Sequence, residues 1–157
     1  MTCWPMAKQS LARFLSRYVP LLIWLIFISV ASSNSFSANN TSRIIGPLVL
    51  WVFPNTTPEQ LATIHFLTRK LAHFTEYAIL ALLAARAFWT SPNPALKRRW
   101  FLISLGIIVV YALIDEFHQS FVPSRTASIA DSVIDMVGGL TALLVLRTRL
   151  RANVASN

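Results

Sequence analysis

Residues 100–119 read WFLISLGIIVVYALIDEFHQ, and this stretch decides the class of fold. Its first fifteen residues carry no charge, whereas its last five contain two acids, a histidine and a glutamine. A membrane-spanning helix needs about 20 mostly apolar residues, which is the length of this stretch. Ionisable side chains in a span are costly unless they meet partners or water. We therefore expect a transmembrane helix with a polar site at one end.

Three further stretches have the composition of membrane spans, so the sequence predicts an all-α integral membrane protein with about four helices. They are residues 14–32, 71–89 and 129–146. The chain is 55% hydrophobic and only 13% charged, whereas a soluble domain is about 25% charged. No repeat or linker divides the sequence, so residues 1–157 are expected to form a single membrane domain. The connection 33–70 is expected to be an outer loop, and its apolar piece 44–53 is too short to span and is expected to be interfacial or re-entrant.

The distribution of basic residues predicts the orientation of the spans. A formal charge of +8 raises the question of nucleic-acid binding, but such proteins carry their basic residues as a patch on a soluble fold. Here the basic groups lie between or beside the apolar runs: Lys8, Arg13 and Arg17, then Lys97, Arg98 and Arg99, then Arg147, Arg149 and Arg151. This positive-inside pattern predicts a multi-pass protein of a cytoplasmic (inner) membrane with both termini in the cytoplasm and no nucleic-acid partner. The alternative for the first run is a cleaved signal peptide, which would leave the other spans in the same orientation.

With this orientation, polar residues converge at the outer ends of three spans. Five of the six acids lie in this region, and only Glu59 lies elsewhere. The candidate site residues are Lys70, His73, Glu76 and Tyr77, then Asp115, Glu116, His118 and Gln119, then Arg125 in the short connection, and then Asp131 and Asp135. Their spacings of three and four residues place them on one face of each helix. Gly138 and Gly139, one turn further along, would let a neighbouring backbone approach closely.

These residues resemble the signature of the VanZ-like family, small polytopic membrane proteins named for a protein associated with teicoplanin resistance. The matching pieces are KLAHFTEY at residues 70–77, DEFHQSFVPSR at 115–125 and SIADSVIDMVGG at 128–139. Two positions depart from the family pattern, since Asp135 stands where asparagine is usual and Ser124 where glycine is usual. The resemblance implies a multi-span fold and an envelope role, but it supplies no reaction.

The residue types fit several chemistries, which the sequence leaves open. A histidine or carboxylate can act as a general base in a partly dry pocket, and the candidate catalytic residues are His73, Glu116, His118 and Asp131. The candidate substrate-binding residues are Lys70, Glu76, Tyr77, Asp115, Gln119, Arg125 and Asp135. Histidine and carboxylates also suit a divalent ion, but no HExxH pattern defines a metal site, so no cofactor is assigned. The alternative is a network of ion pairs that only ties the three spans together.

The preferred functional hypothesis is binding or modification of an envelope amphiphile, such as an envelope lipid or a lipid-linked ligand in the surrounding bilayer. This activity would alter sensitivity to glycopeptide or lipoglycopeptide compounds. One alternative is a small proton-coupled carrier, because chains of carboxylates and histidines can relay protons. With so few spans, a carrier would need to form homo-oligomers. The other alternative is a structural membrane subunit, and the sequence alone leaves open whether any reaction is catalysed.

Overall fold

The computed structural model describes residues 4–32, 38–121 and 128–155, and every regular element within these ranges is an α-helix. Four helices contain stretches long and apolar enough to cross a membrane: α1 (Trp4–Ala31), α3 (Pro58–Trp89), α5 (Trp100–Gln119) and α6 (Ile129–Ala155). Two shorter helices connect them: α2 (Ala38–Val52) and α4 (Pro94–Arg98). The prediction of an all-α integral membrane protein with four spans is confirmed.

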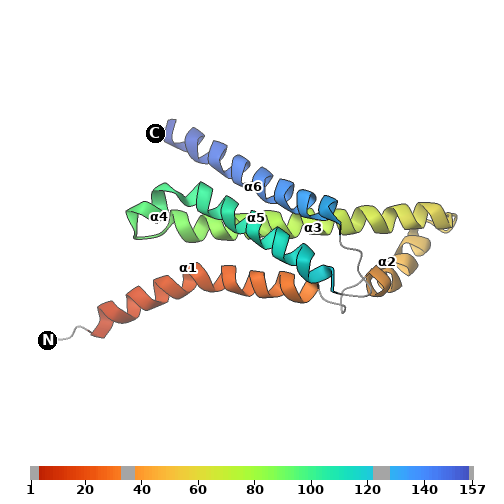
Figure 1. Ribbon diagram of the computed structural model, residues 1–157, viewed down its shortest axis with the longest axis horizontal. Coiled ribbons are helices and arrows are strands. Elements are labelled where there is room, and N and C mark those ends of the chain that lie inside the picture. The colour runs from red at the N-terminus through yellow and green to blue at the C-terminus, as the bar shows by residue number, and fades with distance from the viewer. Residues whose placement is uncertain (1–3, 33–37, 122–127, 156–157) are drawn as a thin grey trace.

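Helix α3 is the centre of the bundle and packs against α6, α5, α1 and α2 (Figure 1). Its contact faces are rich in small residues, and Ala81, Ala84 and Ala85 are fully buried. Small side chains let neighbouring helices approach closely, which is the usual basis of packing between membrane helices. Large apolar side chains such as Ile26 and Leu102 instead point outward and are more than half exposed. Lipid chains would cover these outward faces in a bilayer.

Hydrogen bonds join α1 to the rest of the bundle. The indole N–H of Trp24 donates to the carbonyl oxygen of Glu76 on α3, at 2.9 Å. The Tyr111 hydroxyl of α5 donates to the carbonyl oxygen of Leu25 and lies 2.5 Å from the Ser29 hydroxyl. Polar groups within an apolar bundle need partners, so these bonds fix α1 beside both α3 and α5.

Helix α3 begins at Pro58 rather than at residue 71, so much of the predicted outer loop 33–70 is helical. The cause is a capping box. The Thr57 hydroxyl accepts the Gln60 amide N–H, the Gln60 side chain accepts the Thr57 amide N–H, and Pro58 suits the first helical position. A helix of 32 residues is about 48 Å long, which exceeds the roughly 30 Å hydrocarbon core of a bilayer. Its first turns project beyond the start of α6 (Figure 1).

Most of the apolar piece predicted at residues 44–53 lies in α2, which packs against α3. With 15 residues, α2 is about 22 Å long and too short to cross a bilayer. Trp51 is 81% exposed, and Leu48 and Phe53 are also largely exposed. An interfacial position for this piece stays a prediction, and these exposed apolar side chains favour it.

Candidate functional site

Six ionisable side chains and one glutamine from three helices meet at one end of the bundle, and we call this group the polar layer. Its members are Lys70 and His73 of α3, Asp115, Glu116 and Gln119 of α5, and Asp131 and Asp135 of α6. Lys70 and Glu116 are partly buried, and the other five are buried. Charges removed from water are stable only with partners, so the pairings within the layer decide what it can do.

An ion pair between Lys70 Nζ and Asp131 Oδ1 links α3 to α6 at the edge of the layer. Arg69 lies 3.9 Å from the other carboxylate oxygen of Asp131, so two cations share this acid. The Lys70 ammonium also lies 5.0 Å from the centre of the Phe66 ring, which holds it by a cation–π contact. The Asp131 side chain is only 4% exposed, which leaves this pair largely shielded from water.

One turn deeper, His73 Nδ1 lies 3.2 Å from Asp135 Oδ1, and this contact again joins α3 to α6. Asp115 accepts a hydrogen bond of 2.9 Å from the side-chain amide of Gln119. One ligand atom from each of His73, Asp115 and Asp135 lies within 4.8 Å of the others, and all three residues are buried. An imidazole with two carboxylates has the donor types that Zn²⁺ or Mn²⁺ accepts. The same geometry also allows the histidine and carboxylates to share protons.

Tyr77 lies one turn from His73 on α3 and is fully buried. Its hydroxyl has no hydrogen-bond partner among the described residues. A buried polar atom without a protein partner marks a place where a water molecule or a ligand atom can bind.

Two glycines of α6 fix the distance between the helices of the site. A Cβ at Gly138 would lie 2.3 Å from the carbonyl oxygen of Phe74, the residue after His73. A Cβ at Gly139 would lie 2.8 Å from Cγ2 of Ile108 on α5. Consecutive glycines therefore bring α6 close to both neighbours. The predicted close approach of a backbone is seen at Gly138, whereas Gly139 meets a side chain.

The other predicted site residues lie around this centre. The Glu116 carboxylate accepts the amide N–H of Ser128 just before α6, which ties the end of α5 to the start of α6. Glu76 is partly buried, and its backbone carbonyl holds Trp24 of α1. His118 is exposed on α5. Arg125 lies outside the described residues, and its predicted role in substrate binding stays a prediction.

Sequence reasoning did not assign Arg69 or Ser132 to the site. Arg69 shares Asp131 with Lys70, and Ser132 is buried with its hydroxyl 3.4 Å from the carbonyl oxygen of Ala112. A signal for Arg69 existed, because a second basic residue next to Lys70 contradicts the positive-inside rule for an outer helix end. Ser132 gave no such signal, since a serine within an apolar helix is common.

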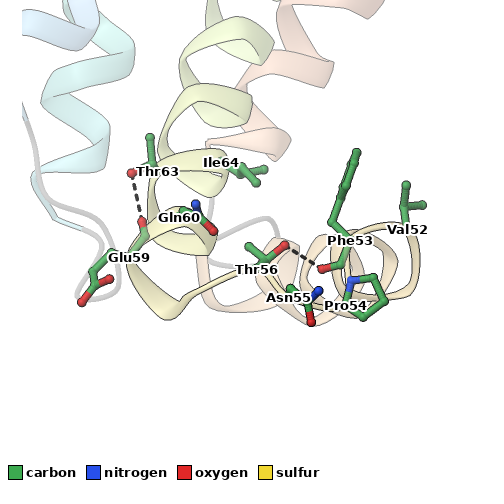
Figure 2. Close-up of a pocket in the computed structure, with 9 residues that line it drawn as sticks. All are labelled: Val52, Phe53, Pro54, Asn55, Thr56, Glu59, Gln60, Thr63 and Ile64. Carbon is green, nitrogen blue, oxygen red and sulfur yellow. Dashed lines mark hydrogen bonds between the residues drawn. The ribbon is translucent and has the colours of Figure 1, made fainter.

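Two hollows lie near this end of the molecule. One of about 390 Å³ lies between α1 and α3, with a mostly apolar lining that includes Trp24, Phe27 and Leu71 and with Thr75 and Glu76 at its polar side. The other, of about 740 Å³, lies at the turn between α2 and α3, where Figure 2 shows Phe53, Thr56 and Glu59 around it. Glu59 precedes Lys70 by eleven residues, or about 16 Å along the helix, so the second hollow is separate from the polar layer.

A family model described as VanZ/LLP1 matches residues 16–150 of the chain. The matched range contains every residue of the polar layer and most of the four long helices. The resemblance inferred from the three motifs is therefore confirmed. No curated protein and no solved structure matches the chain significantly.

Proposed function

Because the chain belongs to the VanZ/LLP1 family, we propose that it acts in the cell envelope by binding the polar head of a membrane amphiphile at the polar layer. The observation that carries this proposal is the burial of His73 and three aspartates, with a partly buried Lys70, among apolar helices. Ionisable groups within a membrane bundle are costly and usually belong to a functional site. The proposed ligand is an envelope lipid or a lipid-linked molecule, and its binding alters sensitivity to lipoglycopeptide-type compounds.

The proposed location is a cytoplasmic membrane, with both termini inside and the polar layer at the outer leaflet. Figure 1 shows the N-terminus, α4 and the C-terminus at one end of the bundle, and the start of α6 toward the other. The basic residues of α4 and of the last turns of α6 thus share one end. The positive-inside rule assigns that end to the cytoplasm, which supports an outward-facing polar layer.

The contacts of the layer suggest how an anionic head group would bind. Lys70 and Arg69 both approach Asp131, and an incoming phosphate or carboxylate could exchange with that aspartate. The apolar hollow between α1 and α3 reaches Glu76 and would accept part of an acyl chain. If the bound amphiphile is also modified, His73 is the proposed general base, with Asp135 orienting its ring. Catalytic roles for Glu116, His118 and Asp131 stay proposals of the same kind.

A structural role is the second candidate, because the same layer makes repeated contacts between helices. The Lys70–Asp131 and His73–Asp135 contacts both join α3 to α6, and Glu116 joins α5 to the start of α6. Such a network could serve assembly alone. The carrier hypothesis, with its homo-oligomer, stays a prediction from the sequence.

The experiment measures teicoplanin susceptibility of a bacterial host expressing the wild-type chain or a variant, together with the amount of each protein in the membrane. Asp131→Asn removes the carboxylate, and Glu59→Gln is the matched control because it removes an acid from α3 outside the layer. We expect Asp131→Asn to lose the phenotype at normal abundance and Glu59→Gln to keep it. If the wild type itself changes neither susceptibility nor envelope composition, the proposal is wrong.

A charge-reversed pair separates binding from assembly. The double variant Lys70→Asp/Asp131→Lys restores an ion pair between α3 and α6 but reverses the positions of its charges. If the double variant is as abundant as the wild type and has the same effect on teicoplanin susceptibility, the layer is structural. If the double variant is as abundant as the wild type but has no effect on teicoplanin susceptibility, the original arrangement of charges recognises a ligand.

A further inference from the structure

The end of the bundle opposite the polar layer carries a basic cavity of about 1130 Å³. It lies between the corner formed by α4 and α5 and the last turns of α6, and we call it the arginine cavity. The residues that define it are Arg98, Arg99, Arg147 and Arg151, with Trp89 and Trp100 beside them. Two separate segments of the chain thus direct arginines to one hollow.

The arginines of this cavity have no acidic residue nearby in the sequence. The chain has no acid before Glu59, none between Glu76 and Asp115, and none after Asp135. Glu76 precedes Trp89 by thirteen residues, or about 20 Å along α3. Four guanidinium groups therefore gather at an end of the bundle to which these segments bring no acidic side chain. Their positive charge favours an external anion.

A ring contact orients one of these arginines, and a second lies on the same helix face. Arg147 and Arg151 are four residues apart on α6, so they lie on the same face of the helix. The guanidinium carbon of Arg147 lies 5.1 Å from the centre of the Phe101 ring, a cation–π contact that fixes the side chain toward α5. Arg149 lies between them in the sequence but is not part of the cavity lining. The cavity therefore involves one face of α6 rather than all of its basic residues.

The remaining lining indicates a lipid rather than a soluble anion. Trp89 and Trp100 lie with ring centres 6.5 Å apart, and tryptophan is typical of the membrane interface. Leu102 also lines the cavity and is 68% exposed, which provides a surface for an acyl chain along α5. Arginine binds phosphate oxygens through paired hydrogen bonds, and basic pockets between membrane helices bind anionic lipid heads. We propose that the arginine cavity binds the head group of an anionic phospholipid.

This inference goes beyond the proposed function and does not depend on it. The test is thermal unfolding of the full chain in an uncharged detergent, with phosphatidylglycerol, phosphatidylcholine or inorganic phosphate added. A lipid that binds only the folded protein raises the melting temperature. We expect phosphatidylglycerol to raise it for the wild type, and we expect no comparable rise with phosphatidylcholine or inorganic phosphate.

Variants then locate the effect. Arg147→Gln and Arg151→Gln should each reduce the shift, and the double variant should abolish it. Arg149→Gln is the matched control, because it removes the same charge from the same helix outside the lining, and it should keep the full shift. Native mass spectrometry should show phosphatidylglycerol retained on the wild type and on Arg149→Gln, but not on the Arg147→Gln/Arg151→Gln double variant.

Three outcomes would overturn the proposal. An equal shift with phosphatidylcholine would mean general lipid solvation, and an equal shift with inorganic phosphate would mean a free-anion site. A loss in Arg149→Gln as large as that in Arg147→Gln would mean that total charge, not the cavity, attracts the lipid. If an α6 variant does not fold, Arg98→Gln repeats the test from the α4 side of the cavity, where Arg98 is exposed, and it should likewise reduce the shift.

Discussion

Replacing Gly138 by alanine would test how closely α6 crosses α3. The new Cβ would lie 2.3 Å from the carbonyl oxygen of Phe74, and this obstacle is backbone that cannot rotate away. Restoring a separation of 3.0 Å requires the helices to move apart by about 0.7 Å. The same movement would lengthen the 3.2 Å contact between His73 and Asp135 to about 3.9 Å, beyond hydrogen-bond range.

The expected loss of stability follows from these two effects. Over-packing of an interior typically costs about 1–3 kcal/mol. Loss of a hydrogen bond between membrane helices adds roughly 0.6–1.7 kcal/mol. Alanine is the better helix former by about 1 kcal/mol, which offsets part of this sum, so we expect Gly138→Ala to lower the free energy of unfolding by about 1–4 kcal/mol. The assay is thermal unfolding in detergent, followed by the amount of folded protein that remains on size-exclusion chromatography.

Gly106→Ala is the control, because a Cβ at Gly106 meets nothing within 4 Å. Alanine is the better helix former by about 1 kcal/mol, so this variant should unfold at the same or a higher temperature than the wild type. If Gly138→Ala unfolds at the same temperature as Gly106→Ala, then α6 does not approach α3 as described. The pairings assigned to the polar layer would then be wrong as well.

Three further variants probe single contacts by the same unfolding assay. Tyr111→Phe removes a donor to an α1 carbonyl and should cost about 0.6–1.7 kcal/mol, and an unchanged stability would contradict that bond. Lys70→Met leaves the buried Asp131 without its closest cation and should cost about 3–5 kcal/mol, whereas adding Asp131→Leu should recover much of that loss. A double-mutant cycle of His73→Ala and Asp135→Ala should give a coupling of about 0.5–3 kcal/mol, and additive effects would argue against their contact.

The membrane spans could be predicted because a run of apolar residues reports directly on burial in lipid. Helix α5 occupies residues 100–119, the range of its predicted span. Runs of this kind do not report where a helix ends in water, so α1, α3 and α6 extend beyond the predicted ranges. For α3, the sequence Thr57-Pro58-Glu59-Gln60 carries the capping signal, and a search for helix starts would have located it.

The composition of the polar layer could also be predicted, but its pairings could not. Helical spacing shows which residues share a face, whereas partners across helices depend on direction, rotation and distance. Lys70 and His73 are three residues apart on α3, and Asp131 and Asp135 are four apart on α6. Because α5 returns the chain between them, α3 and α6 run in the same direction (Figure 1). Steps of one turn on each helix then stack the Lys70–Asp131 and His73–Asp135 contacts, provided that Gly138 lets the helices meet.

The two ends of the bundle hold their charges in opposite ways, and this difference determines how each could bind a ligand. In the polar layer, buried charges already face internal partners, as with Lys70 and Asp131. A ligand there must displace a partner or use an unsatisfied group such as the Tyr77 hydroxyl, so binding requires local rearrangement. In the arginine cavity, Arg98 and Arg147 are exposed. Neither forms an ion pair with a described residue, so an anionic head group can bind there without displacing such a partner. Salt should weaken that binding far more than binding at the shielded polar layer.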